Sequence, residues 1–415
     1  MFETIPQPPN NRGKWFVLSV VFLDMVGIGI AFPVVPILLG DFTESRELQT
    51  YWFMVLGAGY GLMQFLFAPI LGAISDRFGR RIVLISAILA LGLHYVLIAT
   101  AVSIWVLLAA RLFGGITGAS YSVANAYLAD ISTPEDRARN FGLVGAAFGL
   151  GFICGPMLGG ILGEIDLRLP FYAAAGLSFA NALYGYLVVP ESLPPERRGA
   201  FSLRRANPFR ALTDLVRNKV VGSLVIVFAL FTLAHMTMIQ TWVLYTHFRF
   251  DWGTRENGML LFCVGLLSVV VQGGLIGRLV KRFGEERLAL TAIGVNVLVQ
   301  MAYGLAQSGW MMFPILFFGF LIFTAGPAVQ GVVSKSADPK TQGITLGSLQ
   351  SINSLAMVAG PLIGNAILAQ VASLPPSDIR MGASFFFCAA LNVAAFVLLA
   401  WRLSRASALA SHEAN

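Results

Sequence analysis

The feature that most constrains this chain is a recurring apolar segment that is long enough, as a helix, to cross a lipid bilayer. A bilayer core about 30 Å thick takes roughly 20 apolar helical residues. Twelve such segments follow one another along the 415 residues. The predicted spans are residues 15–38, 51–74, 82–101, 104–128, 140–163, 170–189, 220–245, 257–279, 288–308, 310–333, 343–370 and 381–403.

Composition agrees with a membrane protein. Hydrophobic residues make up 57% of the chain and charged residues 12%, whereas soluble domains carry roughly 25% charged residues. This composition excludes an ordinary soluble enzyme, and so much apolar surface excludes a disordered chain. We therefore expect an all-α membrane protein with 12 transmembrane helices. Cys154, Cys263 and Cys388 stand singly in apolar segments, so we expect neither disulfides nor metal ligation.

The distribution of Lys and Arg predicts that both termini are cytoplasmic. With that orientation, 22 of the 28 Lys and Arg residues fall in cytoplasmic segments and five in outer segments, and Arg111 lies inside a span. Cytoplasmic loops of membrane proteins collect basic residues in this way. The same bias accounts for the net charge of +7, so we expect no nucleic-acid partner. Met1 to Arg12 are polar and contain proline, so we expect no cleavable signal peptide.

An internal repeat divides the chain into two halves. Residues 71–79 match residues 276–284, and residues 155–159 match residues 360–364, both at an offset of 205. The predicted organisation is two pseudo-repeated six-helix bundles, the architecture of secondary transporters with a site near the midplane between the halves. The predicted boundaries are 1–189 for the first bundle, 190–219 for a cytoplasmic linker, 220–403 for the second bundle and 404–415 for a cytoplasmic tail.

Two charged residues lie inside predicted spans. Asp24 follows Lys14 by ten residues, which is roughly 15 Å along a helix and about mid-membrane. A carboxyl group there can load and release a proton, or it can be a static partner of Arg111. Burying Arg111 costs at least about 2.5 kcal/mol on insertion scales, so it needs a partner or a wet cavity.

Three motifs carry a resemblance to a known family. They are Gly72-Ala73-Ile74-Ser75-Asp76-Arg77-Phe78-Gly79-Arg80-Arg81 between spans two and three, Leu108-Ala109-Ala110-Arg111-Leu112-Phe113-Gly114-Gly115 in span four, and Gly151-Phe152-Ile153-Cys154-Gly155-Pro156-Met157-Leu158-Gly159-Gly160 in span five. The first resembles the loop signature of the major facilitator superfamily, and the second resembles that family's second motif. The third resembles the antiporter motif of its drug exporters.

The resemblance implies a role for each motif. It implies that Asp76 and Arg80 latch one conformation, within a gating loop that comprises Gly72, Asp76, Arg77, Gly79, Arg80 and Arg81. Apart from the resemblance, the arginines also set topology. Gly72 can permit close helix approach, and Gly79 can supply a tight turn. The glycines and Pro156 of span five permit a bend and close helix packing.

Within the superfamily, the chain is similar to the tetracycline/proton antiporter group over nearly its whole length. Asp24-Met25-Val26-Gly27-Ile28-Gly29 and Gln64-Phe65-Leu66-Phe67-Ala68-Pro69 carry this narrower resemblance. It implies that Asp24, Gln64 and Arg111 line the transport path. Where the group has an acid in span three, this chain has His94, and Asn296 and Ser268 stand where the group has an acid and a histidine. Gln272 matches. These departures place proton coupling on Asp24, His94 and Arg111, and make tetracycline a less expected cargo.

Several polar side chains in spans can touch a substrate or hold helices together. His94 can titrate near neutral pH or be a neutral bond between helices, and His235 has the same two interpretations. The amides predicted to line a cavity are Asn125, Gln240, Gln272, Asn296, Gln300, Gln330, Gln350 and Asn353. The aromatic residues that could stack on a flat ligand are Tyr121, Tyr127, Trp242 and Tyr245.

These observations predict a secondary active exporter in the inner membrane of a bacterial cell. We expect antiport of protons against a drug or other small amphipathic molecule, with the proton gradient as energy source and no cofactor. We expect a monomer in contact with membrane lipids. One alternative is an exporter of a metabolite, lipid-like molecule or siderophore, and another is a non-transporting scaffold. An enzyme is not expected, because HExxH, GxSxG and Walker motifs are missing from the sequence.

Overall fold

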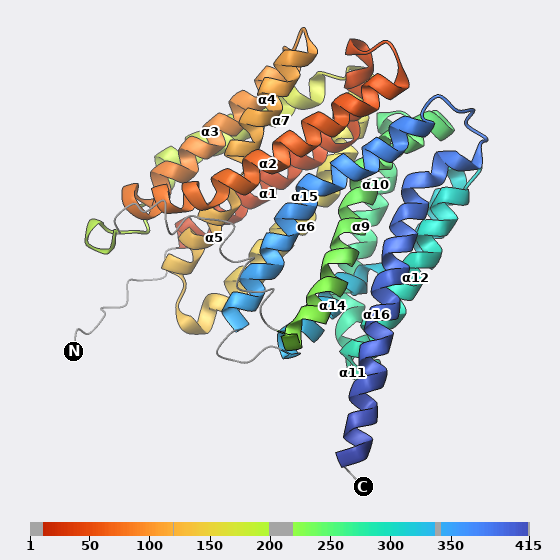
Figure 1. The fold of residues 1–415 in the computed structure, drawn as a ribbon. Coiled ribbons are helices and arrows are strands. Elements are labelled where there is room, and N and C mark those ends of the chain that lie inside the picture. The colour runs from red at the N-terminus through yellow and green to blue at the C-terminus, as the bar shows by residue number, and fades with distance from the viewer. Residues whose placement is uncertain (1–10, 119, 199–218, 337–341, 414–415) are drawn as a thin grey trace. The chain divides into compact units, whose positions relative to one another are not determined.

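The computed structural model describes residues 11–118, 120–198, 219–336 and 342–413 (Figure 1), and the regular elements in these ranges are helices, with no strand. The predicted linker 190–219 and tail 404–415 lie partly outside the described residues. Contacts divide the chain into two compact units, which we treat separately. Unit 1 comprises Met1–Val35 and Leu62–Asn207, and unit 2 comprises Pro36–Gly61 and Pro208–Asn415.

Unit 1 contains the helices of the first half of the chain. They are α1 (Asn11–Leu38), α2 (Arg46–Phe78), α3 (Arg80–Ala99), α4 (Ile104–Thr117), α5 (Ser120–Ile131), α6 (Pro134–Ile165), α7 (Leu169–Val188) and the short turn η2 (Pro195–Arg197). The end of α1 and the first half of α2 group with unit 2 instead. Figure 1 shows α3 beside both α4 and α7, the neighbours with which it shares its closest contacts.

Unit 2 repeats the same kind of bundle. Its elements are η1 (Leu39–Phe42), α9 (Lys219–Phe250), α10 (Thr254–Val270), η3 (Val271–Leu275), α11 (Ile276–Phe283), α12 (Glu285–Leu305), η4 (Gly309–Met311), α13 (Met312–Phe318), α14 (Ile322–Ser336), α15 (Gln342–Val371), η5 (Ile379–Gly382) and α16 (Ala383–Glu413). Helix α9 packs along both α15 and α16. Contacts also place residues 36–61 here, because a Cβ built on Gly61 would lie 2.8 Å from the carbonyl oxygen of Met357 in α15.

Each predicted span coincides with a helix or with a broken pair of helices. Among the described residues, nine helices are long and apolar enough to cross a membrane, and ten are if one bent pair counts as a single span. The chain is a multi-pass membrane protein, while twelve spans with both ends inside stay a prediction. Helix α4 is too short for that test because α4 ends at Thr117, where three glycines in five residues weaken the helix.

Two more predicted spans are interrupted in unit 2. Helices α10 and α11 are joined through η3, a π-helical turn that contains two consecutive glycines. Helices α13 and α14 are bent by 44° at a short break that contains Gly319. Glycine lowers the cost of leaving regular helix geometry, and π turns often occur at functional sites.

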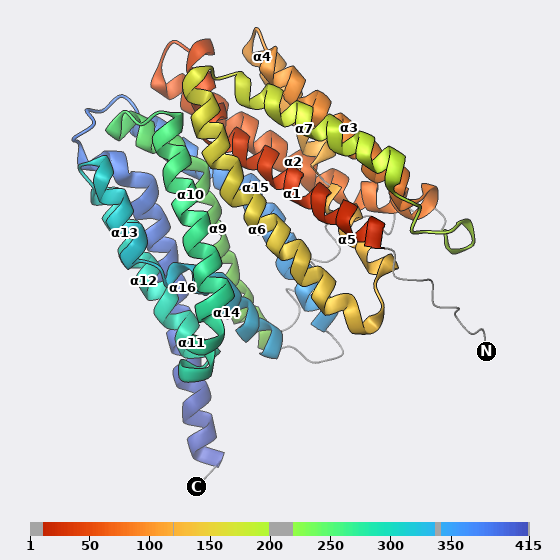
Figure 2. The same ribbon diagram turned by 180° about the vertical axis from the view of Figure 1, so that it is seen from behind.

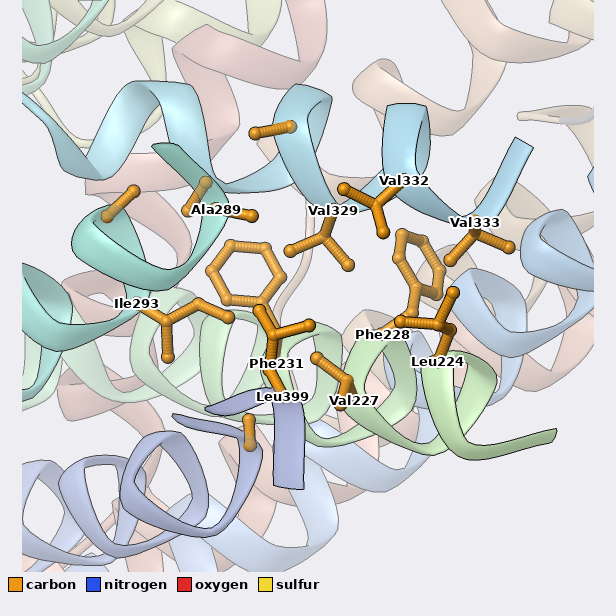
Figure 3. Close-up of a cluster of buried hydrophobic side chains, with 14 of the residues drawn as sticks. Leu224, Val227, Phe228, Phe231, Ala289, Ile293, Val329, Val332, Val333 and Leu399 are labelled. Carbon is orange, nitrogen blue, oxygen red and sulfur yellow. The ribbon is translucent and has the colours of Figure 1, made fainter. Parts of the chain in front are cut away.

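Each unit has its own apolar core. In unit 2, Phe228 and Phe231 of α9 pack among Ile293 of α12, Val329 of α14 and Leu399 of α16 (Figure 3). In unit 1, buried side chains of α1, α3, α5, α6 and α7 form the core. Many large apolar side chains elsewhere are exposed, as expected where lipid tails rather than water cover the surface.

Candidate functional site

Glycines of α6 form a seam against the backbone of α1, the neighbour beside it in Figure 2. Gly151, Gly155 and Gly159 are four residues apart, so they lie on one face of the helix. A Cβ built on Gly151 would lie 2.5 Å from the carbonyl oxygen of Phe22, and one on Gly155 would lie 2.6 Å from that of Val26. These distances are too short for a side chain, so the predicted antiporter motif is where two helix backbones meet.

The seam continues on the side of α1. A Cβ built on Gly29 would lie 2.7 Å from the Cδ atom of Pro156 and 2.9 Å from the Cα atom of Gly155. Gly160, the last residue of the predicted motif, is buried in the same helix. Small residues on both helices therefore make the close approach possible.

Asp24 lies in the turn of α1 that the seam holds. It stands between Phe22 and Val26, and its side chain is buried, with 7% exposed. Gly27, three residues later, faces the hydroxyl group of Tyr95 in α3, which occupies the space of a Cβ. Helix packing against α6 and α3 therefore sets the position of this acid.

His94 lies against α4 rather than in open space. Its ring is buried, and its Nδ1 atom lies 2.7 Å from the carbonyl oxygen of Ala110. Because a carbonyl oxygen only accepts, Nδ1 carries the proton of this bond. The ring occupies the space that a Cβ of Gly114 would need. Arg111 follows Ala110 directly and acts electrostatically on the ring.

Gln64 of α2 lies at the end of α4. Its Nε2 atom donates to the carbonyl oxygen of Gly118 at 3.2 Å, at the point where α4 ends. Its Oε1 atom is buried and has no hydrogen-bond partner in the described part of the chain. Gln64, His94 and Arg111 are thus gathered on or against α4, while Asp24 stands on α1.

The gating loop contains an ion-paired arginine. Arg80, the first residue of α3, lies 2.5 Å from Asp76 at the end of α2 and 3.3 Å from Asp130 at the end of α5. It also donates to the hydroxyl group of Ser75 at 2.6 Å. Arg80 is 13% exposed, whereas Asp76 is 55% exposed, so water screens this pair and it contributes little stability by itself. The geometry is that of a contact that can break at low cost.

Glu191 completes this cluster, and the sequence analysis did not identify it. Its carboxylate accepts backbone N–H bonds from Arg80 at 2.8 Å and from Arg81 at 3.2 Å, the first two residues of α3. It also accepts bonds from the N–H groups of Ser192 and Leu193, both at 3.0 Å. An acid at a helix N-terminus compensates the unpaired N–H groups there. The only local sign was an acid two residues after span six.

The other residues of the loop differ in what they contact. Gly79 has a φ of 105°, which glycine adopts readily, and this turn separates α2 from α3. Arg81 donates to the carbonyl oxygen of Tyr186 at 2.6 Å, and Arg77 lies over the ring of Phe78. At Gly72 no described atom lies within 4 Å of a built Cβ, so the close helix approach expected at this glycine stays a prediction.

In unit 2, two predicted cavity amides lie between helices. Asn296 of α12 is buried and donates to the side chain of Asn392 in α16 at 3.2 Å. Gln300 is buried and bonds the sulfur atom of Met238 at 3.1 Å. Both arrangements hold helices together.

The remaining amides are more accessible. Gln272 lies in the π turn and donates to Ser268 at 2.8 Å. Gln330 and Gln350 are exposed, and Asn125, Gln240 and Asn353 are half-buried. His235 is accessible and its ring is stacked on that of Phe231, 6.2 Å away.

The aromatic candidates are part of packed regions. Trp242 is buried and makes edge contacts with Tyr303 and Phe385. Tyr245 donates to the carbonyl oxygen of Tyr303 at 2.6 Å, and Tyr127 donates to that of Pro190 at 2.8 Å. The side chain of Tyr121 lies outside the described residues.

Two further features bear on ligands. A shallow groove of about 530 Å³ on α2, α3 and α4 is lined mainly by apolar side chains such as Leu71, Ile82 and Phe113, and by none of the predicted path residues.

Within the described ranges, no group of three or more His, Cys, Asp or Glu side chains could hold a metal ion.

Comparisons with known proteins bear on the family. Residues 17–361 match the family described as Major Facilitator Superfamily. The chain is 40% identical to the class C tetracycline resistance protein of Escherichia coli over 367 residues, which cover 88% of this chain and 91% of that protein. It is 26% identical to the crystal structure of the human organic anion transporter MFSD10, with a TM-score of 0.68 and coverage of 95% and 100%. The nucleoside transporter NupG shares the fold, with a TM-score of 0.74, 12% identity and coverage of 94% and 98%.

The matched region includes α1, α6 and the gating loop, so the seam, the buried acid and the ion-paired turn all fall within it. Extensive identity over most of both chains accompanies the helical fold. The chain belongs to the major facilitator superfamily.

Proposed function

We propose that this chain exports a drug or other small amphipathic molecule from a bacterial cell across its inner membrane, in exchange for protons. The observation that carries the proposal is the buried acid Asp24, held in α1 by the glycine seam of α6. Relatives that are named tetracycline resistance proteins support drug export. Transport is the function, not enzymatic catalysis. The chain acts as a monomer surrounded by lipid and needs no cofactor beyond the proton gradient.

The proposed cycle assigns one chemical task to Asp24. A carboxyl group in a low-dielectric surrounding binds a proton more readily than one in water. Asp24 takes up a proton from outside, the protonated form releases the cargo, and proton release to the cytoplasm resets the site. Arg111 of α4 supplies donors and the Oε1 atom of Gln64 supplies an acceptor, so the cargo carries both acceptor and donor groups. His94 is a second candidate for proton coupling.

A second cargo class has support of its own. Arg111 lies inside α4 and is half-buried, and a guanidinium group shielded from water favours an anionic ligand. A relative with 26% identity is titled an organic anion transporter. Export of an anionic metabolite, lipid-like molecule or siderophore is therefore the alternative to drug export. A chain with no transport activity would instead be a scaffold.

The test is proton movement in proteoliposomes on addition of a compound panel that contains tetracyclines and organic anions. We expect at least one compound to release protons in the wild type and none in Asp24→Asn. The matched control is Asp251→Asn, an exposed acid with a φ of 57°, where asparagine is well tolerated. Equal transport in Asp24→Asn and Asp251→Asn would remove Asp24 from the mechanism. A response to anions alone would favour the alternative cargo.

A further inference from the structure

The two units contain the same turn, 205 residues apart. Arg77-Phe78-Gly79 and Arg282-Phe283-Gly284 each end one helix and start the next. The glycines have φ of 105° and 77° and ψ of 148° and 158°. In both turns the guanidinium group lies over the ring of the next residue, at 5.2 Å and 5.5 Å. The repeat is thus preserved in backbone and side-chain geometry.

Directly around this turn the charges are reversed. Arg80 begins α3 and pairs with Asp130 at the end of α5, at 3.3 Å. At the same offset of 205, Glu285 begins α12 and pairs with Lys335 at the end of α14, at 2.9 Å. The charge is reversed at two further positions of the repeat: Lys281 stands at the position of Asp76, and Glu286 stands at that of Arg81.

Reversing both charges leaves the attraction within an ion pair unchanged. It changes how each charge interacts with the partial charge of the helix end that carries it. The N-terminus of a helix carries a partial positive charge and the C-terminus a partial negative charge. Glu285 and Glu286 in the first turn of α12 are therefore favourable, as is Lys335 in the last turn of α14. In unit 1, Arg80 and Arg81 begin α3, where positive charge is unfavourable.

Glu191 supplies the missing negative charge in unit 1. Its carboxylate bonds the N–H groups of Arg80 and Arg81 and lies against Gly79. The segment that carries it is fixed, because Tyr127 donates to the carbonyl oxygen of Pro190. In unit 2 the position at the same offset is Phe396, inside α16. The acid from a distant segment therefore occurs in unit 1, where positive charges stand in the first turn of α3.

We propose that Glu191 is a positioning residue of the gating loop. Its carboxylate holds the start of α3 so that Arg80 can pair with Asp76 and Asp130. The sign-reversed Glu285–Lys335 pair of unit 2 needs no such residue. The proposal rests on the proposed transport function. It makes the segment after α7 part of the gate, through a carboxylate that contacts no cargo.

The primary variant is Glu191→Gln, and Glu196→Gln in the exposed turn η2 is the matched control. We expect the maximal transport rate of Glu191→Gln to fall about tenfold, the effect of one well-placed helix-end charge, with KM for the cargo unchanged. Amide hydrogen exchange at Arg80 and Arg81 should accelerate, while exchange at Glu285 and Glu286 should not. Glu196→Gln should match the wild type in every measurement.

A rescue variant separates positioning from general damage. Arg81→Glu places an acid at the position that corresponds to Glu286, so Glu191→Gln with Arg81→Glu should recover slow hydrogen exchange at Arg80. Three results would overturn the proposal: unchanged exchange in Glu191→Gln, faster exchange with an undiminished transport rate, or no recovery in the double variant. Hydrogen exchange is measured without cargo. Failure of the export proposal would be recognised separately, because no compound would then release protons in the wild type.

Discussion

At the C-terminal end of α9, Arg249 connects three parts of unit 2. It is 6% exposed and donates to the carbonyl oxygens of Ala306 at 2.7 Å and Asp378 at 2.9 Å. Ala306 is the residue directly after α12, and Asp378 directly precedes η5 and α16. A guanidinium group with several directed donors is suited to collecting such carbonyls.

We expect Arg249→Ala to destabilise the protein by about 2–4 kcal/mol, because the lost charge-assisted bonds leave buried carbonyl groups without partners. The comparison is Arg380→Ala nearby. The side-chain hydrogen bond from Arg380 lowers the pKa of the Asp378 carboxyl to about 2, yet the Arg380 side chain is exposed, so its removal should change stability little. Thermal unfolding in detergent measures both. Equal midpoints for the two variants would show that Arg249 has no structural role.

At the scale of elements, the α1–α6 seam makes a sharp prediction. Gly155→Ala would place a Cβ 2.6 Å from the carbonyl oxygen of Val26 and 2.8 Å from the Cα atom of Gly29. Backbone atoms cannot yield as a side chain can, so the helices must separate, at a cost of about 1–3 kcal/mol. Because the seam holds the turn that carries Asp24, we expect proton-coupled transport to fall with stability.

Gly145→Ala in the same helix is the control. No described atom lies within 4 Å of a Cβ there, and alanine is the better helix former by up to about 1 kcal/mol. This variant should be as stable as the wild type or more stable, with full transport. If Gly155→Ala behaved like Gly145→Ala in a transport assay, close packing would not be the reason for the motif.

Particular elements show what the sequence could and could not predict. Hydropathy located the helices, because length and apolar composition suffice to identify a span. It could not locate the end of α4 at Thr117 or the π turn at Val271–Leu275, because both spans remain apolar throughout. Glu191 was missed because its partners lie 110 and 111 residues away in the chain. Arg249 was counted only as a basic residue in a loop, since its partners are carbonyl groups that no sequence pattern reveals.

At the scale of the whole molecule, the number of spans and the side of each terminus are linked by parity. An even number places both ends on one side of the membrane, and an odd number separates them. The described residues contain nine or ten helices that pass a test of length and composition. The short α4 falls below that test, although α5 extends the same predicted span. The basic residues, 22 against five, favour both ends on the cytoplasmic side.

Cysteine labelling in intact cells tests this topology. We expect Asn11→Cys and Ser404→Cys to react with a membrane-impermeant maleimide after permeabilisation alone, because both positions flank basic cytoplasmic segments. Ser377→Cys, in the exposed loop before η5, should react in intact cells. The parent chain with Cys154, Cys263 and Cys388 is the blank, since these residues are buried or half-buried. Labelling of one terminus in intact cells and not the other would mean an odd number of spans. That result would contradict two six-helix bundles.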